Sequence, residues 1–417
     1  MKAGRRDKLI DAIVFGVLLV AVSAVTVILF YRQTIGSEAL YHSDMKAYIL
    51  EMQGMDSGYE FPYPVFFKLG ALIHLFAGPE MAVAIATMML NSLAVVITKL
   101  AFNHLVPRKG VADGVFISVL TVALFFVSML FPPQGIELPG ILRKYLGVFT
   151  PNPFHNATYL AARPFSILAF LWFVKLLPEY EKGLKRSNLT DALLFSVFLL
   201  LATMTKPSFT LILVSTAGLI MLYRLIRSKF RNIVPTLQFG LLFVPTFIDL
   251  LYQFKGVFVP DAGAEGGIGF CFGEVWLRYC KNLPLAVCLG VGFPLAVLVS
   301  NFKKCKKNTM FLFSWQLYIV SFAEAFFLYE KGFRKYDFNF CWGYICGMFF
   351  CFFAALPVLM QSTVEEIKGM VVVQGTGFWE KLWVRRTLLV LQWLAFAWHL
   401  VCGADYFADI FSGAMYY

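Results

Sequence analysis

Residues 9–31 read LIDAIVFGVLLVAVSAVTVILFY, an almost unbroken apolar run with one charged side chain, Asp11. A helix of this length can cross a hydrocarbon core of about 30 Å, which needs about 20 apolar residues. A cleaved signal peptide would have a shorter apolar region followed by a small-residue cleavage site. The run therefore predicts a first membrane-spanning helix that the protein retains.

The composition of the whole chain agrees with this prediction. Of its 417 residues 59% are hydrophobic and 15% are charged, and the mean hydropathy is +0.72. Soluble domains are about 45–50% apolar and about 25% charged, which excludes a soluble enzyme of two or three domains. Further apolar runs occupy residues 80–104, 111–131, 161–178, 189–204, 207–223, 233–252, 283–301, 309–329, 339–360 and 387–404. We predict an all-α fold in which residues 1–417 form one transmembrane domain, a polytopic helix bundle of about eleven spans.

One apolar stretch, residues 65–77, is too short to cross the membrane. Its 13 residues contain Lys68 and His74, and they would form only about 20 Å of helix. We therefore expect an amphipathic helix that lies in the membrane interface, within a first external loop at residues 32–79.

The distribution of basic residues predicts the orientation of the bundle. If residues 65–77 do not cross the membrane, six segments lie on the same side of it as the N-terminus: 1–8, 105–110, 179–188, 224–232, 302–308 and 361–386. Together with Lys99 and Lys175 at adjoining helix ends, they hold 23 of the 36 lysines and arginines. Basic residues concentrate on cytoplasmic loops, so we expect a cytoplasmic N-terminus and an external C-terminus. The net charge of +11 then reflects topology, and no nucleic-acid partner is predicted.

The longest loops fall mainly on the predicted external side, at residues 32–79, 132–160 and 253–282, while the cytoplasmic side has one long loop at 361–386. Loops longer than about 12–15 residues in a compact protein are usually functional or disordered. The external loops are rich in Trp, Tyr, Phe and Pro, which is not a disordered composition. We therefore expect the active face to lie outside, at the cell membrane.

An acid follows soon after the first span, in the sequence Tyr41-His42-Ser43-Asp44. A carboxylate just outside the bilayer lies where a lipid-carried substrate would present its head group, so Asp44 is a candidate general base. The alternative is that Asp44 only caps the helix that follows it, because Asp is a preferred N-cap residue. His42 is a candidate donor to a sugar hydroxyl, or it simply covers the interface. Glu60 could replace Asp44, contact substrate or a cation, or remain a solvated acid.

Four basic residues near external helix ends are candidates for binding a phosphate: Arg163, Lys206, Arg334 and Lys335. Lys206 is the most informative, because the turn Thr205-Lys206-Pro207-Ser208 separates two apolar runs and holds this lysine at the membrane surface. Lysine and arginine bind phosphate oxygens strongly. The alternative is that Lys206 only extends its amine toward water from an apolar surface.

Two further residues are candidates for contact with substrate. Glu324 is a carboxylate inside the run 309–329, where an acid is a functional candidate by default. It either binds a donor sugar or pairs with a nearby arginine. His155 lies in the rigid, polar segment 151–158 of the second external loop.

Motifs for other chemistries are missing from the sequence. The eight cysteines include no C-x-x-C pair, so they predict no metal site. Cys271 and Cys280 share one loop and are the only pair that could form a disulfide, but free thiols are the favoured interpretation. The sequence has no G-x-x-x-x-G-K-[ST], H-E-x-x-H or G-x-S-x-G motif, which disfavours ATP-driven transport and cytosolic nucleotide-sugar transfer.

Together these features resemble the GT-C superfamily of integral membrane glycosyltransferases. The similarity covers the layout of almost the whole chain, with a long first external loop, an interfacial helix and about eleven spans. At residue level it rests on the acid of Tyr41-His42-Ser43-Asp44 and on Lys206-Pro207, which is similar to the lysine-proline turn of some polyprenyl-dependent mannosyltransferases. Many GT-C members have two adjacent acids here, whereas Met45 follows Asp44 in this chain. A requirement for a divalent metal is therefore left open.

The resemblance implies transfer of a sugar from a polyprenyl-phosphate donor to a hydroxyl, with inversion at the anomeric carbon. It implies that Asp44 deprotonates the acceptor and that Lys206, Arg163, Arg334 and Lys335 bind the donor phosphate, so that fixed cations replace a metal. No cofactor is then expected. The expected partners are membrane lipid, the lipid-linked sugar and a glycan or glycolipid acceptor of the cell-envelope polysaccharide.

Two other functions fit the membrane and an external site. A lipid-linked polysaccharide polymerase or ligase would rely on Arg and His in a large late loop rather than on an acid in the first loop. A flippase or transporter of lipid-linked sugars would have paired charges in the middle of the membrane, for which Glu324 and Asp249 are the only candidates.

Overall fold

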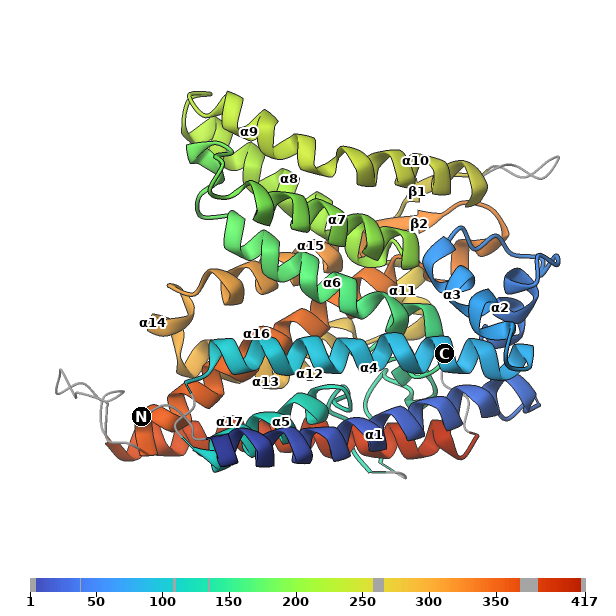
Figure 1. Ribbon diagram of the computed structural model, residues 1–417, viewed down its shortest axis with the longest axis horizontal. Coiled ribbons are helices and arrows are strands. Elements are labelled where there is room, and N and C mark those ends of the chain that lie inside the picture. The colour runs from blue at the N-terminus through green and yellow to red at the C-terminus, as the bar shows by residue number, and fades with distance from the viewer. Residues whose placement is uncertain are drawn as a thin grey trace.

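The structure, a computed structural model, describes residues 5–37, 39–107, 110–133, 136–257, 266–367 and 382–413. Within these residues the regular secondary structure is almost entirely helical, with one two-stranded sheet (Figure 1). The prediction of an all-α bundle is confirmed. Residues 258–265 of the predicted loop 253–282 and residues 368–381 of the predicted loop 361–386 lie outside the described part of the chain.

The elements follow one another from the N-terminus as a series of long and short helices. The helices are α1 (Arg5–Ile35), α2 (Met45–Met52), α3 (Pro64–His74), α4 (Pro79–Leu105), α5 (Val111–Leu124), α6 (Ala157–Leu176), α7 (Leu189–Thr205), α8 (Ser208–Arg227), α9 (Ile233–Gly240), α10 (Val244–Val257), α11 (Glu274–Tyr279), α12 (Leu283–Gly290), α13 (Gly292–Ser300), α14 (Phe302–Cys305), α15 (Thr309–Phe327), α16 (Cys341–Ile367) and α17 (Leu382–Phe411). Short 3-10 helices are η1 (Arg143–Val148), η2 (Tyr180–Lys182), η3 (Leu241–Phe243) and η4 (Phe333–Tyr336). Strands β1 (Ile268–Phe270) and β2 (Leu328–Glu330) pair antiparallel, with Ile268 opposite Glu330.

Eight helical segments of the described chain are long and apolar enough to cross a membrane. They are Arg6–Ile35, Pro79–Leu105, Ala157–Leu176, Ser208–Arg227, Ile233–Lys255, Thr309–Phe327, Arg334–Ile367 and Leu382–Phe411. Helices α12 and α13 meet at a bend of 69° and together make a ninth candidate, while α5 and α7 are apolar but shorter. The chain is therefore a multi-pass membrane protein.

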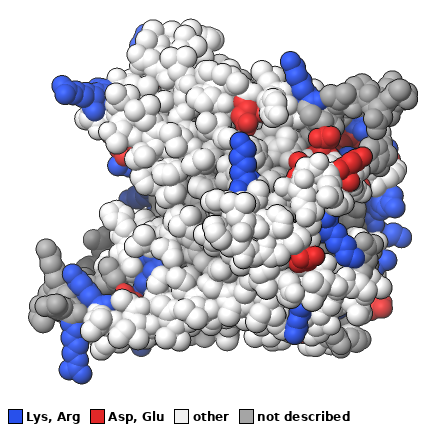
Figure 2. Space-filling model, turned by 45° about the vertical axis from the view of Figure 1, so that its right-hand side comes forward, with Lys and Arg blue, Asp and Glu red and all other residues white. Residues whose placement is uncertain are grey.

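The two ends of the bundle differ. Helices α2 and α3 and the sheet gather at one end, here called the sheet end, and α14 lies at the other, the α14 end (Figure 1). Helices α1 and α17 both finish at the sheet end, where Arg32 Nη1 donates to the carbonyl of Phe411 at 3.0 Å. The first and last described residues consequently lie at opposite ends. Figure 2 shows a largely uncharged surface, with acidic side chains mainly on the side where the sheet end is turned forward and basic side chains toward both ends.

Helix α16 forms the centre of the bundle, and its residues 343–360 are all buried. Phe350 stacks on Phe170 of α6 with ring centroids 4.4 Å apart, and Phe353 packs on Phe102 of α4 at 5.3 Å. Such aromatic pairs bury large apolar areas and add specific edge and face contacts. They hold α4, α6 and α16 in a fixed relation, which sets the positions of the loops at the sheet end.

The predicted span 111–131 is helical only over α5, and its last part is irregular. Irregular backbone at membrane depth is tolerated only where other parts of the protein satisfy its polar groups. The Ser128 N–H donates to the carbonyl of His399 in α17 at 3.1 Å. The carbonyl of Val127 accepts a bond of 2.8 Å from Asn152. The irregular segment is thus bonded both to α17 and to the loop that leads into α6.

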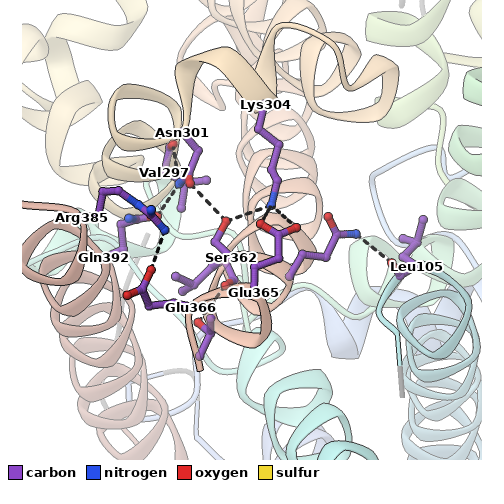
Figure 3. A network of polar contacts seen from close by, with 12 residues as sticks. Leu105, Val297, Asn301, Lys304, Ser362, Glu365, Glu366, Arg385 and Gln392 are labelled. Atoms are coloured by element: carbon purple, nitrogen blue, oxygen red, sulfur yellow. Dashed lines mark hydrogen bonds and ion pairs between the residues drawn. The ribbon is translucent and has the colours of Figure 1, made fainter. Parts of the chain in front are cut away.

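At the α14 end, polar side chains fasten three helices together (Figure 3). Lys304 of α14 donates to Glu365 of α16 at 2.9 Å, and Arg385 of α17 pairs with Glu366 at 2.6 Å. Side chains in such partly exposed pairs lose rotamer freedom, so each pair contributes about 1 kcal/mol at most. These two contacts hold α16 against α14 and α17 at the end of the bundle that is remote from the sheet.

Candidate functional site

A cavity of about 660 Å³ lies at the sheet end. Its polar part is lined by charged and polar side chains that come from distant parts of the sequence: His42, Asp44, His155, Lys206, Glu324, Glu330 and Arg334. Its apolar lining includes Leu211 of α8 and Phe247, Leu250, Leu251 and Phe254 of α10, which are here called the apolar wall. Ligand pockets of this size hold molecules of several tens of atoms. The combination of a charged part and an apolar wall suits a ligand with a polar head and a hydrocarbon tail.

Asp44 immediately precedes α2, but its side chain does not cap that helix. Instead, its Oδ2 accepts hydrogen bonds from the Tyr48 hydroxyl and from Asn156 Nδ2, each at 3.0 Å. The interpretation of Asp44 as only a cap is therefore wrong. Within the described residues Oδ1 accepts no hydrogen bond, and the side chain faces the cavity. One carboxylate oxygen is thus anchored and the other is available to a ligand.

Lys206 connects α7 to α8 and is buried, with 6% of its surface exposed. Its Nζ donates to Asn156 Oδ1 and to Thr158 Oγ1, each at 3.2 Å, and lies 4.7 Å from the centroid of the Trp342 ring. The lysine therefore does not extend toward bulk water. Burial lowers the pKa of Lys206 to about 8, an effect that Asp44 partly opposes. Pro207 directly precedes α8, which begins at Ser208.

Asn156 occupies the N-cap position of α6, where its Oδ1 accepts a bond of 3.0 Å from the Tyr159 N–H. This capping bond is the reason why the chain turns into a helix directly beside the cavity. The same oxygen accepts from Lys206, and the amide nitrogen donates to Asp44. Thr158 completes the arrangement by bonding to the Tyr48 hydroxyl at 3.1 Å. Loops far apart in sequence are thereby joined into one polar network.

The other predicted substrate contacts, His42, His155 and Glu324, all line the cavity. The Nδ1 atom of His155 is buried and has no hydrogen-bond partner among the described residues, and burial lowers the pKa of this residue to about 4. His155 is therefore neutral at pH 7. Within the described residues Glu324 forms no ion pair with an arginine, so the ion-pair alternative for this residue is wrong.

The two basic residues of η4 have different surroundings. Arg334 lines the cavity, but its Nε lies 3.4 Å from Glu330 and 3.3 Å from Asp337. Its charge is thus shared with two carboxylates. Lys335 is not among the lining residues and pairs instead with Glu274 at 2.7 Å. The structure therefore brings only Arg334 of this pair toward a ligand in the cavity.

Arg163 and Glu60 also lie outside the cavity lining. Arg163 is buried in α6, where its Nη2 donates to the carbonyl of Pro151 at 2.8 Å and its guanidinium packs over Phe349. It faces a separate space of about 10 Å³, room for about one water molecule. Glu60 is exposed, although its neighbours Tyr59 and Phe61 line the cavity. Arg163 therefore supports the loop at Pro151 from behind, because helix α6 directs its side chain away from the cavity.

Sequence reasoning missed several residues of the site, namely Tyr48, Asn156, Thr158, Glu330 and Trp342. Tyr48 follows Asp44 by one helical turn, a spacing that places both on one face and could have indicated their contact. Asn156 and Thr158 form an N-x-T tripeptide, which suggests glycosylation. Asn156 is only 1% exposed, however, so it is an internal hydrogen-bonding residue rather than a glycan acceptor. Glu330 carried no sequence signal.

Two further predictions concern cysteines and metals. Cys271 and Cys280 are both free thiols in the structure, so the disulfide alternative is not realised. Among the described residues, no three His, Cys, Asp or Glu side chains are grouped so that they could hold a metal ion.

No family model matches the chain, and no curated protein matches it either. Its function is therefore inferred from the cavity, where a candidate base, a buried cation and an apolar wall share one space.

Proposed function

We propose that the chain is an inverting glycosyltransferase of the GT-C type, which moves a sugar from a polyprenyl-phosphate donor to an acceptor hydroxyl. The observation that carries the proposal is that Asp44, Lys206 and an apolar wall line one cavity. Such a transfer requires a base for the acceptor, a positive charge for the leaving phosphate and a surface for the lipid. All three are present within about 660 Å³.

In the proposed reaction Asp44 is the general base. Its Oδ1 takes the proton of the acceptor hydroxyl while the acceptor oxygen bonds to the anomeric carbon. The bond from that carbon to the phosphate oxygen breaks on the opposite face, and its electron pair remains on the phosphate. Lys206 stabilises the charge that develops on the leaving group, and its bonds to Asn156 and Thr158 hold it in place beforehand.

The apolar wall would hold the polyprenyl chain. Leu211, Phe247, Leu251 and Phe254 line the cavity and are also exposed, Leu251 to 62%. In a membrane such exposed apolar side chains face lipid. The donor would therefore enter the cavity sideways from the bilayer, with its phosphate directed toward Lys206.

The proposal includes an orientation, with the N-terminus in the cytoplasm and the cavity and C-terminus at the external face. It is supported by the positions of the first and last described residues at opposite ends of the bundle and by the positive-inside distribution of charge. The eight long helices, the bent pair α12 and α13, and the shorter α5 and α7 would be the eleven crossing segments. Helix α3 would lie in the interface, because the exposed Leu75 and Phe76 follow it directly.

The decisive test is Asp44→Asn in purified, detergent-solubilised protein. The substrates are undecaprenyl-phosphate hexoses and pentoses together with acceptor glycolipids extracted from the native membrane, and products are detected by mass spectrometry. We expect turnover to fall by about 10²–10⁴-fold with an unchanged melting temperature, because the side chain keeps its shape. Assays with and without a chelator determine whether a divalent metal takes part.

Lys335→Met is the matched control, because Lys335 is paired with Glu274 outside the cavity lining. It should retain full activity, whereas Lys206→Met should raise KM for the donor and lower kcat. Full activity of Asp44→Asn would overturn the proposal. Consumption of pyrophosphate-linked glycan that does not depend on Asp44 would indicate a polymerase or ligase. Translocation of the donor without bond cleavage would indicate a flippase.

A further inference from the structure

Asp44 and Lys206 carry opposite charges and line the same cavity, yet they form no ion pair with each other. The carboxamide of Asn156 stands between them. Its Nδ2 donates to Asp44 Oδ2 at 3.0 Å, and its Oδ1 accepts from Lys206 Nζ at 3.2 Å. A carboxamide has a donor at one end and an acceptor at the other. It can therefore satisfy an anion and a cation at once, which neither a carboxylate nor an apolar side chain can do.

The orientation of this carboxamide is fixed by its other contacts. The Tyr159 N–H and the Thr158 hydroxyl both donate to Oδ1, each at 3.0 Å, so the oxygen must face them and Lys206. Asn156 is 1% exposed and forms the N-cap of α6, which prevents it from turning away. Its nitrogen is consequently held toward Asp44.

We propose that Asn156 is a positioning residue that keeps the base and the phosphate-binding lysine from neutralising each other. This inference rests on the proposed function. A direct ion pair between Asp44 and Lys206 would favour the charged carboxylate and lower its basicity, while it occupied the ammonium that has to attract phosphate. With Asn156 in place, each charged group has one side bonded to a neutral amide and another side facing the cavity.

The experiment measures the binding of one defined probe, undecaprenyl phosphate in detergent micelles, by titration calorimetry. The main variant is Asn156→Ser. Serine retains a side-chain oxygen for the N-cap of α6, but it is too short to bridge Asp44 and Lys206. The two charged groups can then pair directly, and the pair must open before phosphate binds. We expect the affinity for the probe to fall about tenfold.

The second arm removes the charge of Asp44 in the same background. In the double variant Asn156→Ser/Asp44→Asn the lysine has no anion to pair with, so the affinity should return to that of Asp44→Asn alone. A merely structural loss at Asn156 would not be rescued in this way. Asn156→Asp retains the N-cap and an oxygen that accepts from Lys206, but this oxygen belongs to a negatively charged carboxylate. That carboxylate would itself pair with Lys206, so this variant should bind the probe weakly with or without Asp44→Asn.

The outcomes separate this inference from the proposed function. If the unmodified protein does not bind the probe, or if Lys206→Met binds it equally well, the proposed function fails. If the unmodified protein binds it through Lys206 but Asn156→Ser binds equally well, the positioning role is overturned. The same conclusion follows if Asn156→Ser binds weakly and the double variant is not rescued. Wild-type affinity in Asn156→Asp would also overturn it.

Discussion

Lys206 is charged in surroundings that oppose its charge. Burial lowers its pKa to about 8, while Asn156, Thr158 and the face of the Trp342 ring supply partners for the ammonium. The side chain is therefore protonated below that pH and neutral above it. We predict that binding of undecaprenyl phosphate by the free protein is nearly constant between about pH 7 and pH 8 and weakens about tenfold for each further pH unit.

Calorimetric titration across this range tests the prediction, and Lys206→Arg is the control. A guanidinium remains protonated up to about pH 12, so the arginine variant should keep its affinity at alkaline pH. The phosphate gains no further charge in this range, since its second pKa is about 6. An alkaline loss of equal size in both proteins would show that another group is responsible.

The individual residues of the site differ in how far their roles could be predicted from the sequence. The position of Asp44 and Lys206 at the cavity could be predicted, because both lie beside apolar runs on the predicted external side, where topology does not require a charged residue. The contact of Asn156 with Asp44 could not, because it joins residues that are 112 positions apart in the sequence. Residue type also did not show which way a side chain points, and Arg163 and Lys335 therefore turned out to lie outside the cavity lining.

At the level of elements, α17 contacts the irregular segment after α5 so closely that Gly403 has no room for a side chain. A Cβ atom at this position would collide with the carbonyl of Phe126. The segment cannot easily move away, because the Ser128 N–H is bonded to α17 and the carbonyl of Val127 is bonded to Asn152. Gly403→Ala should therefore destabilise the protein by about 1–3 kcal/mol, visible as a lower melting temperature in detergent.

Gly218 in α8 provides the control, because a Cβ atom there would meet nothing within 4 Å. Gly218→Ala should leave the melting temperature unchanged or raise it, since alanine is favoured over glycine in a helix by about 0.5–1 kcal/mol. Equal melting temperatures for Gly403→Ala and Gly218→Ala would contradict the close contact. Gly403→Ala should also weaken probe binding, because Asn152 links the displaced segment to the loop before Asn156.

Hydropathy located the helices but not the points where they break. The predicted spans 111–131 and 283–301 are apolar throughout, yet the first loses its helix after Leu124 and the second bends between α12 and α13. An apolar run indicates that residues avoid water. It contains no information on which neighbouring segment will bond to their backbone, and here those neighbours come from α17 and from the loop at Asn152.

The two ends of the whole molecule differ in what they contain. The cavity and the sheet occupy one end, while the other holds the polar contacts of α14, α16 and α17 (Figure 3). The basic residues of the sequence concentrate in segments that include α14. A positive end of this kind faces the cytoplasm in most membrane proteins. The α14 end should therefore face the cytoplasm, and the cavity, which lies at the opposite end, should face the outside.

Single cysteines and a membrane-impermeant maleimide test this prediction in intact cells. Cys288→Ser is the background, because Cys288 is exposed whereas the other seven cysteines are buried. Cysteines placed at the exposed positions Gln53 and Ser412, at the sheet end, should react from outside. A cysteine at the exposed Ser187, in the loop between α6 and α7, should react only after the membrane is permeabilised. The reverse pattern would place the cavity on the cytoplasmic side and exclude an external acceptor. Labelling of all three cysteines from outside would mean that the helices do not cross the membrane in the proposed order.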